Sequence, residues 1–83
     1  MDIRRINSEA IWLLRMLIVA GAEAETPLPN AWIQARALEA GGLEGEELEL
    51  ALTYAGGKDW LDTGARPDTT KLTSFGEQAA KSF

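Results

Sequence analysis

The sequence contains no cysteine and no histidine. Without cysteine there is no disulfide framework, and the redox compartment stays open. Metal sites built from cysteine and histidine ligands are excluded, because neither ligand type is present. The histidine-dependent designs of most familiar hydrolases are excluded for the same reason.

Catalytic and cofactor motifs are also missing. The glycines follow no dinucleotide- or phosphate-binding pattern, and the serines and threonines have no evident basic partner to activate them. Four acids, Glu44, Glu46, Glu47 and Glu49, lack the alternation of a calcium-binding loop. We therefore expect no enzyme, no metal site and no cofactor, and we interpret these glutamates as a solvated acidic face.

Positive charge is scarce. Lys and Arg number 8 against 13 Asp and Glu, which gives a formal net charge of −5. This balance repels nucleic-acid phosphates at long range. The chain has 83 residues, 46% of them hydrophobic, so we expect one small globular domain over residues 1–83.

No hydrophobic run is long enough to span a bilayer, which takes about 20 apolar residues. Residues 11–20 follow two arginines and precede an Ala-Glu-Ala sequence, as in a secretory signal. Against export, Arg15 interrupts this run and Glu9 borders it. We expect a cytoplasmic protein with no membrane segment.

Residues 10–20 form the first predicted helix, with Asn7 or Ser8 as its cap and Gly21 at its end. The helix is apolar nearly all round, which is typical of a helix that is buried all round. At 100° per residue, one broad face carries Ala10, Leu13, Leu14, Leu17 and Ile18. The opposite face carries Trp12, Met16 and Val19, and it is covered either by Ile3, Ile6 or Phe83 of the same chain, or by a partner or second copy.

Two further helices follow. The second runs from Asn30, its expected cap, to Ala40, and its packed positions are Trp32, Ile33, Ala35, Ala37 and Leu38. The Gly41-Gly42 pair ends it and Leu43 fills the turn. The third helix covers residues 45–55 and is expected to stop at Gly56-Gly57. Its buried stripe has the helical spacing i, i+3, i+4, i+7 and consists of Leu48, Ala51, Leu52 and Ala55.

The last third of the chain predicts a hairpin and a short helix. Residues 60–63 and 69–72 flank a loop over residues 64–68, with Leu61 and Leu72 inward and Arg66 and Lys71 outward. A short edge strand is expected over residues 26–28. Thr73 or Ser74 caps the last helix, Ser74 and Glu77 have capping-box spacing, and Phe75 and Ala79 pack on the core. The predicted fold class is α+β, mainly α, with a three-helix core, an antiparallel hairpin and a short C-terminal helix.

Two segments carry a family likeness. GLEGEELELALTYAGGKDWL, residues 42–61, resembles the passage from the third helix into the wing of the winged helix-turn-helix superfamily. KLTSFGEQAA, residues 71–80, resembles the Leu-Thr-x-x-Gly-x-x-Ala exit from the wing in bacterial members. The likeness spans residues 8–80. It implies a winged-helix-like domain that binds DNA, with the third helix in the major groove and the wing on phosphates or the minor groove.

The chain departs from that family where DNA would be bound. No Lys or Arg occurs from Ala37 to Gly57, whereas strong binders use about six to ten phosphate contacts from basic residues. The basic residues left for DNA are few: Arg4 and Arg5 as an N-terminal arm, and Arg66 and Lys71 in the wing. The outward face of the third helix instead carries Glu46, Glu49, Leu50, Thr53 and Tyr54, a composition that favours a protein partner.

Three functions remain open from the sequence. The first is a non-catalytic module that binds a protein through the acidic third helix and the apolar face of the first helix, with homodimerisation as one form of this. The second is a DNA-binding transcriptional regulator whose dimer pools Arg4, Arg5, Arg66 and Lys71. The third is a small acidic inhibitor that occupies the nucleic-acid-binding surface of another protein.

Overall fold

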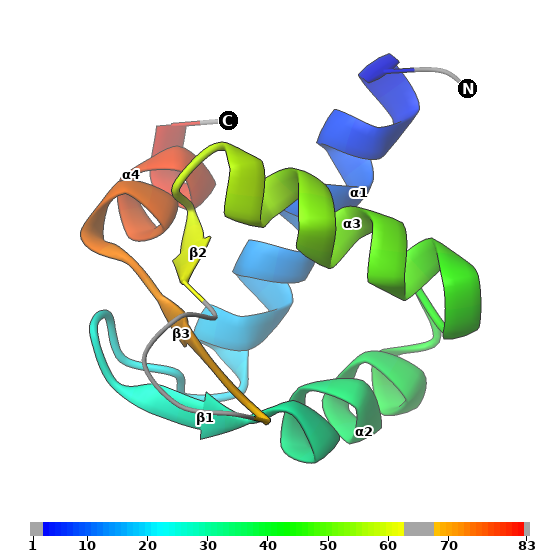
Figure 1. The fold of residues 1–83 in the computed structure, drawn as a ribbon, viewed down its shortest axis with the longest axis horizontal. Helices are drawn as coiled ribbons and strands as arrows, with labels where there is room; N and C mark the ends of the chain where they lie inside the picture. The colour runs from blue at the N-terminus through cyan, green and yellow to red at the C-terminus, as the bar shows by residue number, and fades with distance from the viewer. Residues whose placement is uncertain (1–2, 63–67, 83) are drawn as a thin grey trace.

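The computed structural model describes residues 3–62 and 68–82 (Figure 1). In chain order the elements are α1 (Ile3–Val19), β1 (Pro27–Pro29), α2 (Asn30–Ala40), α3 (Gly45–Gly57), β2 (Leu61–Asp62), β3 (Thr69–Leu72) and α4 (Ser74–Ser82). The predicted class, α+β and mainly α, is confirmed. None of the helices in these residues combines the length and apolar character needed to cross a membrane.

Helix α1 is the element on which the others are assembled. It packs against α2, α3 and α4, and in Figure 1 it runs behind α3. Its predicted inner face is confirmed, because Leu13, Leu14 and Leu17 are fully buried. Ala10 and Ile11 are buried beside them, and Ile18 is half-buried. The apolar stripe of α1 therefore supplies the centre of the core.

The predicted start of α1 is wrong by seven residues. The helix begins at Ile3, so Arg4 and Arg5 lie in its first turns and do not form an extended arm. Arg5 Nε lies 3.0 Å from Glu9 Oε1, an i,i+4 pair that supports the added turns. Asn7 caps nothing, because its Oδ1 accepts a hydrogen bond from the Tyr54 hydroxyl of α3 at 3.0 Å. Ile3, 70% exposed, does not cover α1.

The end of α1 follows the prediction. Gly21 has a φ of 100°, which favours glycine, and its N–H donates to the Ile18 carbonyl. The next N–H, from Ala22, donates to the Leu17 carbonyl at 2.9 Å. These two bonds make a Schellman motif, which satisfies carbonyls that the last helical turn leaves open.

The sheet has the strand order β1-β3-β2, and both pairs are antiparallel. Leu61 pairs with Leu72 and both are buried, so their predicted inward orientation is confirmed. The predicted edge strand exists one residue later than expected, at Pro27–Pro29. Prolines are tolerated there because an edge strand leaves one row of N–H positions unpaired. The predicted turn, with Arg66, lies outside the described residues except for Asp68.

Helix α2 shows two corrections. Its N-cap residue is Pro29, and Asn30 makes no capping bond because its Oδ1 accepts from the Thr70 hydroxyl at 2.6 Å. Ile33 and Ala37 are buried as predicted and Trp32 is half-buried, whereas Ala35 and Leu38 are exposed. Both exposed residues lie on sides of α2 that no other described element covers. At the end of α2, Gly41 is left-handed and Leu43 is buried in the turn, as expected.

Helix α3 buries Leu48, Ala51 and Ala55 and half-buries Leu52, so the predicted stripe holds. The predicted stop at the glycine pair is wrong, because α3 continues through Gly57. The left-handed residue is Asp59, with a φ of 61°. Trp60 N–H donates to the Ala55 carbonyl at 2.9 Å and Asp59 N–H to the Gly56 carbonyl at 3.2 Å, again a Schellman motif.

Helix α4 is capped by Thr73, whose hydroxyl accepts from the Gly76 N–H at 3.0 Å. The predicted Ser74–Glu77 capping box is wrong, since Ser74 is already the first helical residue and its N–H donates to Glu25. Phe75 is 69% exposed and does not pack on the core as predicted. Ala79 packs against the core as predicted, beside the buried Gly76 and Ala80, and these three residues are small enough to let the helix approach closely.

Candidate functional site

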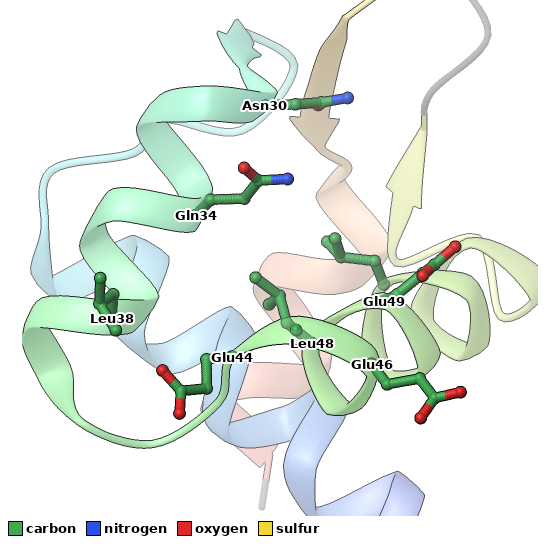
Figure 2. A pocket seen from close by; sticks show the side chains of 9 residues that line it. Asn30, Gln34, Leu38, Glu44, Glu46, Leu48 and Glu49 are labelled. Atoms are coloured by element: carbon green, nitrogen blue, oxygen red, sulfur yellow. The ribbon is translucent and has the colours of Figure 1, made fainter.

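A groove of about 790 Å³ lies between α2 and α3 (Figure 2). The two helices diverge from the turn that joins them, and α1 holds both from behind. A second hollow shares Leu38, Glu44 and Glu46 with the groove and continues it around the turn past Leu43. The groove is lined by Asn30, Gln34 and Leu38 from α2, by Glu44 before α3, and by Gly45, Glu46, Leu48, Glu49 and Leu52 from α3.

The floor of the groove is apolar. Leu48 is buried, Leu52 is half-buried, and Leu38 remains 61% exposed at the side of α2. Figure 2 shows Leu48 from α3 and Gln34 from α2 pointing into the space between the helices. An exposed leucine beside a buried one and a half-buried one makes a surface that a partner can complete, because removing apolar area from water is favourable.

The rim of the groove is acidic. Glu44, Glu46 and Glu49 are all exposed, and Figure 2 shows Glu46 and Glu49 on α3 and Glu44 at the turn near Leu38. Among residues 3–62 and 68–82, none of these three carboxylates takes part in a salt bridge or a side-chain hydrogen bond. The local reason for acids here is the start of α3, where the helix dipole favours negative charge in the first turn. Glu49 lies beyond that turn, so the dipole does not account for it.

The five residues predicted to bind a partner on α3 separate into two groups. Glu46, Glu49, Leu50 and Thr53 are exposed, and the two glutamates line the groove. Tyr54 is half-buried and has structural partners: its hydroxyl donates to Asn7, and its ring meets Trp60 edge-on at 6.0 Å. Lys58 Nζ lies 5.7 Å from the same ring centre. Tyr54 therefore joins α3 to α1 and to the strand that follows.

The predicted face of α1 forms a separate, shallower groove of about 500 Å³ against α2. Trp12, Met16 and Val19 all line it; Val19 is 88% exposed, while Trp12 and Met16 are half-buried. The tip of the Trp12 indole lies directly under Gly42, where a Cβ would have no room. Trp12 thus supports the α2–α3 turn as well as lining this groove. Arg36 and Glu39 of α2, 3.0 Å apart, lie on its other side.

The described basic residues that the DNA alternative uses lie on two different elements, Arg4 and Arg5 on α1 and Lys71 on β3. Arg5 lies on α1 within 3.0 Å of Glu9 and 3.8 Å of Glu47. Lys71 lies on β3, 3.0 Å from Glu25 and 4.0 Å from Asp62. Arg4 is exposed in the first turn of α1 and Arg66 is outside the described residues. Arg5 and Lys71 are therefore already paired with carboxylates.

Sequence reasoning missed the α2 wall of the groove. Leu38 was assigned to the core because it is apolar and lies near Ile33 and Ala37. The available signal was spacing: Asn30, Gln34 and Leu38 recur every four residues, which puts them on one side of α2, offset from the buried pair. Whether that side is covered depends on how far α3 diverges from α2, and spacing alone does not fix that distance.

No protein-family model, curated protein or solved structure matches this chain. The winged-helix likeness therefore stays a prediction from sequence. Within the part of the chain that the structure describes, no group of three or more acidic, cysteine or histidine side chains could hold a metal ion.

Proposed function

We propose that this domain is a non-catalytic protein-interaction module whose binding surface is the outer face of α3 together with the adjacent groove. One observation carries the proposal. Leu38 stays 61% exposed in a groove whose rim has three carboxylates without a described cationic partner. An apolar centre with a charged, hydrated rim is the usual anatomy of a protein interface.

Charge placement favours this function over DNA binding. The helix that would enter the major groove, α3, carries Glu46, Glu47 and Glu49 and no cation before Lys58. Phosphates would repel these acids, and the ion pairs of Arg5 and Lys71 would have to open before either could bind a phosphate. The same charges favour a partner with a basic surface. A small acidic inhibitor of a nucleic-acid-binding protein is the special case in which that basic surface normally holds phosphates.

The α1–α2 groove supplies the second contact in this proposal. Val19 is 88% exposed beside Met16, and Arg36 and Glu39 bring both signs of charge to the opposite wall. A face with both charges can complement its own copy about a two-fold axis. Measuring the mass of the domain in solution for the natural chain and for Val19→Lys tests this contact: a dimer that becomes a monomer supports it, and a monomer in both excludes it.

The proposed location is the cytoplasm. The segment with signal-like features is α1, which supplies Leu13, Leu14 and Leu17 to the core. Cleavage after Ala24 would remove the helix that α2, α3 and α4 all contact. The fold therefore requires α1 to stay attached.

The main test is site-specific photo-crosslinking in the cells that produce the protein. A photoreactive phenylalanine analogue at Thr53, exposed on α3, is expected to trap discrete protein partners. The same analogue at Gln78, exposed on α4, is the matched control and is expected to trap none of them. Charge reversal at Glu46 and Glu49 should abolish the Thr53 products, whereas Glu23→Lys in the α1–β1 loop should not.

A DNA titration of the purified domain separates this proposal from the regulator alternative. We expect no binding at low salt, where electrostatic attraction is strongest. Tight binding that weakens steeply as salt rises would overturn the interaction proposal and favour a dimer that pools its basic residues.

A further inference from the structure

We propose that the α2–α3 groove receives a basic amphipathic helix of the partner protein. This inference rests on the proposed function and adds the chemistry of the partner. Its basis is the groove itself: two helical walls, Leu38, Leu48 and Leu52 between them, and three carboxylates in its lining, Glu44 at the turn and Glu46 and Glu49 on α3 (Figure 2).

The floor requires an apolar occupant. Leu48 and Leu52 are mostly covered by the domain itself, but Leu38 is open to water on the opposite wall. A purely polar cationic ligand, such as a polyamine, would contact the acids and leave Leu38 exposed. Only an occupant with its own apolar side chains removes Leu38 and the exposed part of Leu52 from water at once.

The walls favour a helix over an extended strand. Both sides of the groove are α-helices, whose backbone N–H and C=O groups are already paired within the helix. An extended peptide laid between them would find no backbone partners in the groove, and its own amides would stay dependent on water. A helix satisfies its own backbone and presents apolar residues at i, i+3, i+4 and i+7 to such a groove.

The rim determines the charge of the occupant. Glu44, Glu46 and Glu49 line the groove without an internal counter-ion among the described residues. Glu47 lines the adjoining hollow but lies 3.8 Å from Arg5, so its charge is partly compensated. Lys or Arg residues flanking the apolar stripe of the incoming helix would pair with the three carboxylates of the groove. Such pairs give orientation and a faster association rate more than raw affinity.

A second copy of this chain is a poorer occupant. Its apolar α1–α2 face does carry two arginines, but Arg15 Nε donates to the Ala80 carbonyl at 3.1 Å and Arg36 pairs with Glu39 at 3.0 Å. Those cations are engaged within the domain, so a partner with uncommitted Lys or Arg fits the rim better.

The test uses a synthetic probe in place of the unidentified partner. The probe is a fluorescent Leu/Lys peptide of about 15 residues, a length at which an isolated helix becomes marginally stable, with leucines at helical spacing. Its binding is followed by fluorescence anisotropy. We expect saturable binding at physiological salt, with peptide-induced NMR shifts concentrated at Gln34, Leu38 and Glu49.

Groove variants locate the binding. Leu38→Gln is expected to weaken the probe about tenfold, the effect of losing partial burial of one leucine. The pair Glu46→Gln and Glu49→Gln is expected to weaken it roughly threefold to tenfold, and less at high salt. Phe75→Gln and Glu23→Gln are the matched controls, because both residues are exposed and lie outside the groove; neither should change affinity. Leu38→Ala serves as a second apolar variant if Leu38→Gln alters the circular dichroism spectrum.

Two altered peptides test the helix and the charge. One has the same composition with leucines at every second position, and the other replaces each Lys by Glu; both are expected to bind at least tenfold more weakly than the probe. The inference would be overturned if the alternating peptide bound as tightly as the probe. It would also be overturned if the substitutions at Leu38, Glu46 and Glu49 left the affinity for the probe unchanged. The inference would also be overturned if the domain without peptide had a mass in solution above that of a monomer and Leu38→Gln returned it to the monomer mass. The groove would then hold a second copy of the chain. If the inference failed in one of these ways but Thr53 still gave crosslinks to protein partners, the proposed function would still hold. Loss of the Thr53 crosslinks together with tight DNA binding would overturn both the proposed function and this inference.

Discussion

Gly76 shows how a single missing methyl group sets the position of a helix. On the inner face of α4, its Cα lies against the backbone carbonyl of Trp60, and a Cβ there would also come within 2.9 Å of Leu72 Cδ1. The carbonyl belongs to backbone that cannot rotate away. Any larger residue must therefore push α4 away from Trp60 and Leu72.

We predict that Gly76→Ala lowers the free energy of unfolding by about 1–3 kcal/mol, as overpacking does in tight cores. Urea denaturation followed by circular dichroism measures this. The matched control is Gly56→Ala in α3, where a Cβ meets nothing within 4 Å and the φ is negative. That variant should be more stable than the natural chain by about 0.5–1 kcal/mol. Equal effects of the two substitutions would contradict the packing argument.

Asp59 occupies a conformation that glycine would adopt more easily. Its φ of 61° ends α3, and no described side-chain interaction of Asp59 compensates for the left-handed backbone. We predict that Asp59→Gly raises the free energy of unfolding by about 1 kcal/mol, whereas Asp59→Ala does not. Lys58→Gly controls for glycine itself, since Lys58 has a φ of −93° and should lose stability. The urea midpoints of Asp59→Gly, Asp59→Ala and Lys58→Gly, compared with that of the natural chain, measure these differences in stability.

At the scale of elements, the sequence predicted the helices and the buried faces of α1 and α3, but not the start of α1 or the end of α3. The stripe of α1 and that of α3 were visible in the spacing of leucines and alanines. The ends depend on partners far away in the chain. Asn7 lies inside α1 and its side chain accepts a hydrogen bond from Tyr54, 47 residues later, while α3 passes through Gly56-Gly57 and ends before the left-handed Asp59.

Glu25 connects three elements that are distant in sequence. Its carboxylate lies 3.0 Å from Lys71 Nζ of β3 and accepts from the Ser74 N–H of α4 at 2.9 Å, while its own N–H donates to the Leu72 carbonyl. The hydrogen bond from Lys71, and then the one from Ser74, lower the pKa of Glu25 below its ordinary value of 4.5. The hydrogen bond to Glu25 raises the pKa of Lys71 above 10.5.

These shifts predict an acid-sensitive link. Because the pKa of Glu25 is lower in the folded state, its contribution to stability is fully present above pH 4.5 and is lost as pH falls through the folded value. For Lys71 the sign is opposite: its contribution is present below pH 10.5 and is lost as pH rises through the folded value. Across neutral pH, Glu25 is therefore charged and its interactions with Lys71 and Ser74 are intact.

The measurement is the urea midpoint between about pH 3 and pH 7, where carboxylates titrate. We predict that Glu25→Gln is less stable than the natural chain near neutral pH and that the difference shrinks as the solution is acidified. Glu23→Gln, an exposed neighbour with no described partner, should track the natural chain throughout. Three parallel curves would show that Glu25 contributes nothing through its charge.

At the scale of the whole molecule, the candidate site was predictable in its charge and not in its shape. The glutamates of α3 and the absence of cations were visible in the sequence, so an acidic binding face was expected at Glu46 and Glu49. The groove was not expected, because it exists only where α2 and α3 diverge over α1. That divergence turns Leu38 from a core residue into a wall of the site. It arises from contacts between elements, which local sequence spacing does not encode.

The central position of α1 predicts that the domain unfolds as one unit. A chain of 83 residues has a stability of about 4–12 kcal/mol at roughly 0.05–0.15 kcal/mol per residue. Leu14 is fully buried on α1, and Leu14→Ala is expected to remove about 2–5 kcal/mol of it. Leu50→Ala, at a residue 39% exposed on α3, should change stability by less than about 0.5 kcal/mol.

Two probes in one urea titration test this expectation. Circular dichroism reports helix content, and tryptophan fluorescence reports Trp12 on α1, Trp32 on α2 and Trp60 before β2. Because all three other helices pack on α1, the two transitions should coincide in both variants and shift together in Leu14→Ala. Separate transitions would mean that part of the fold survives without the α1 core, and the groove between α2 and α3 would then be free to change width independently of the rest.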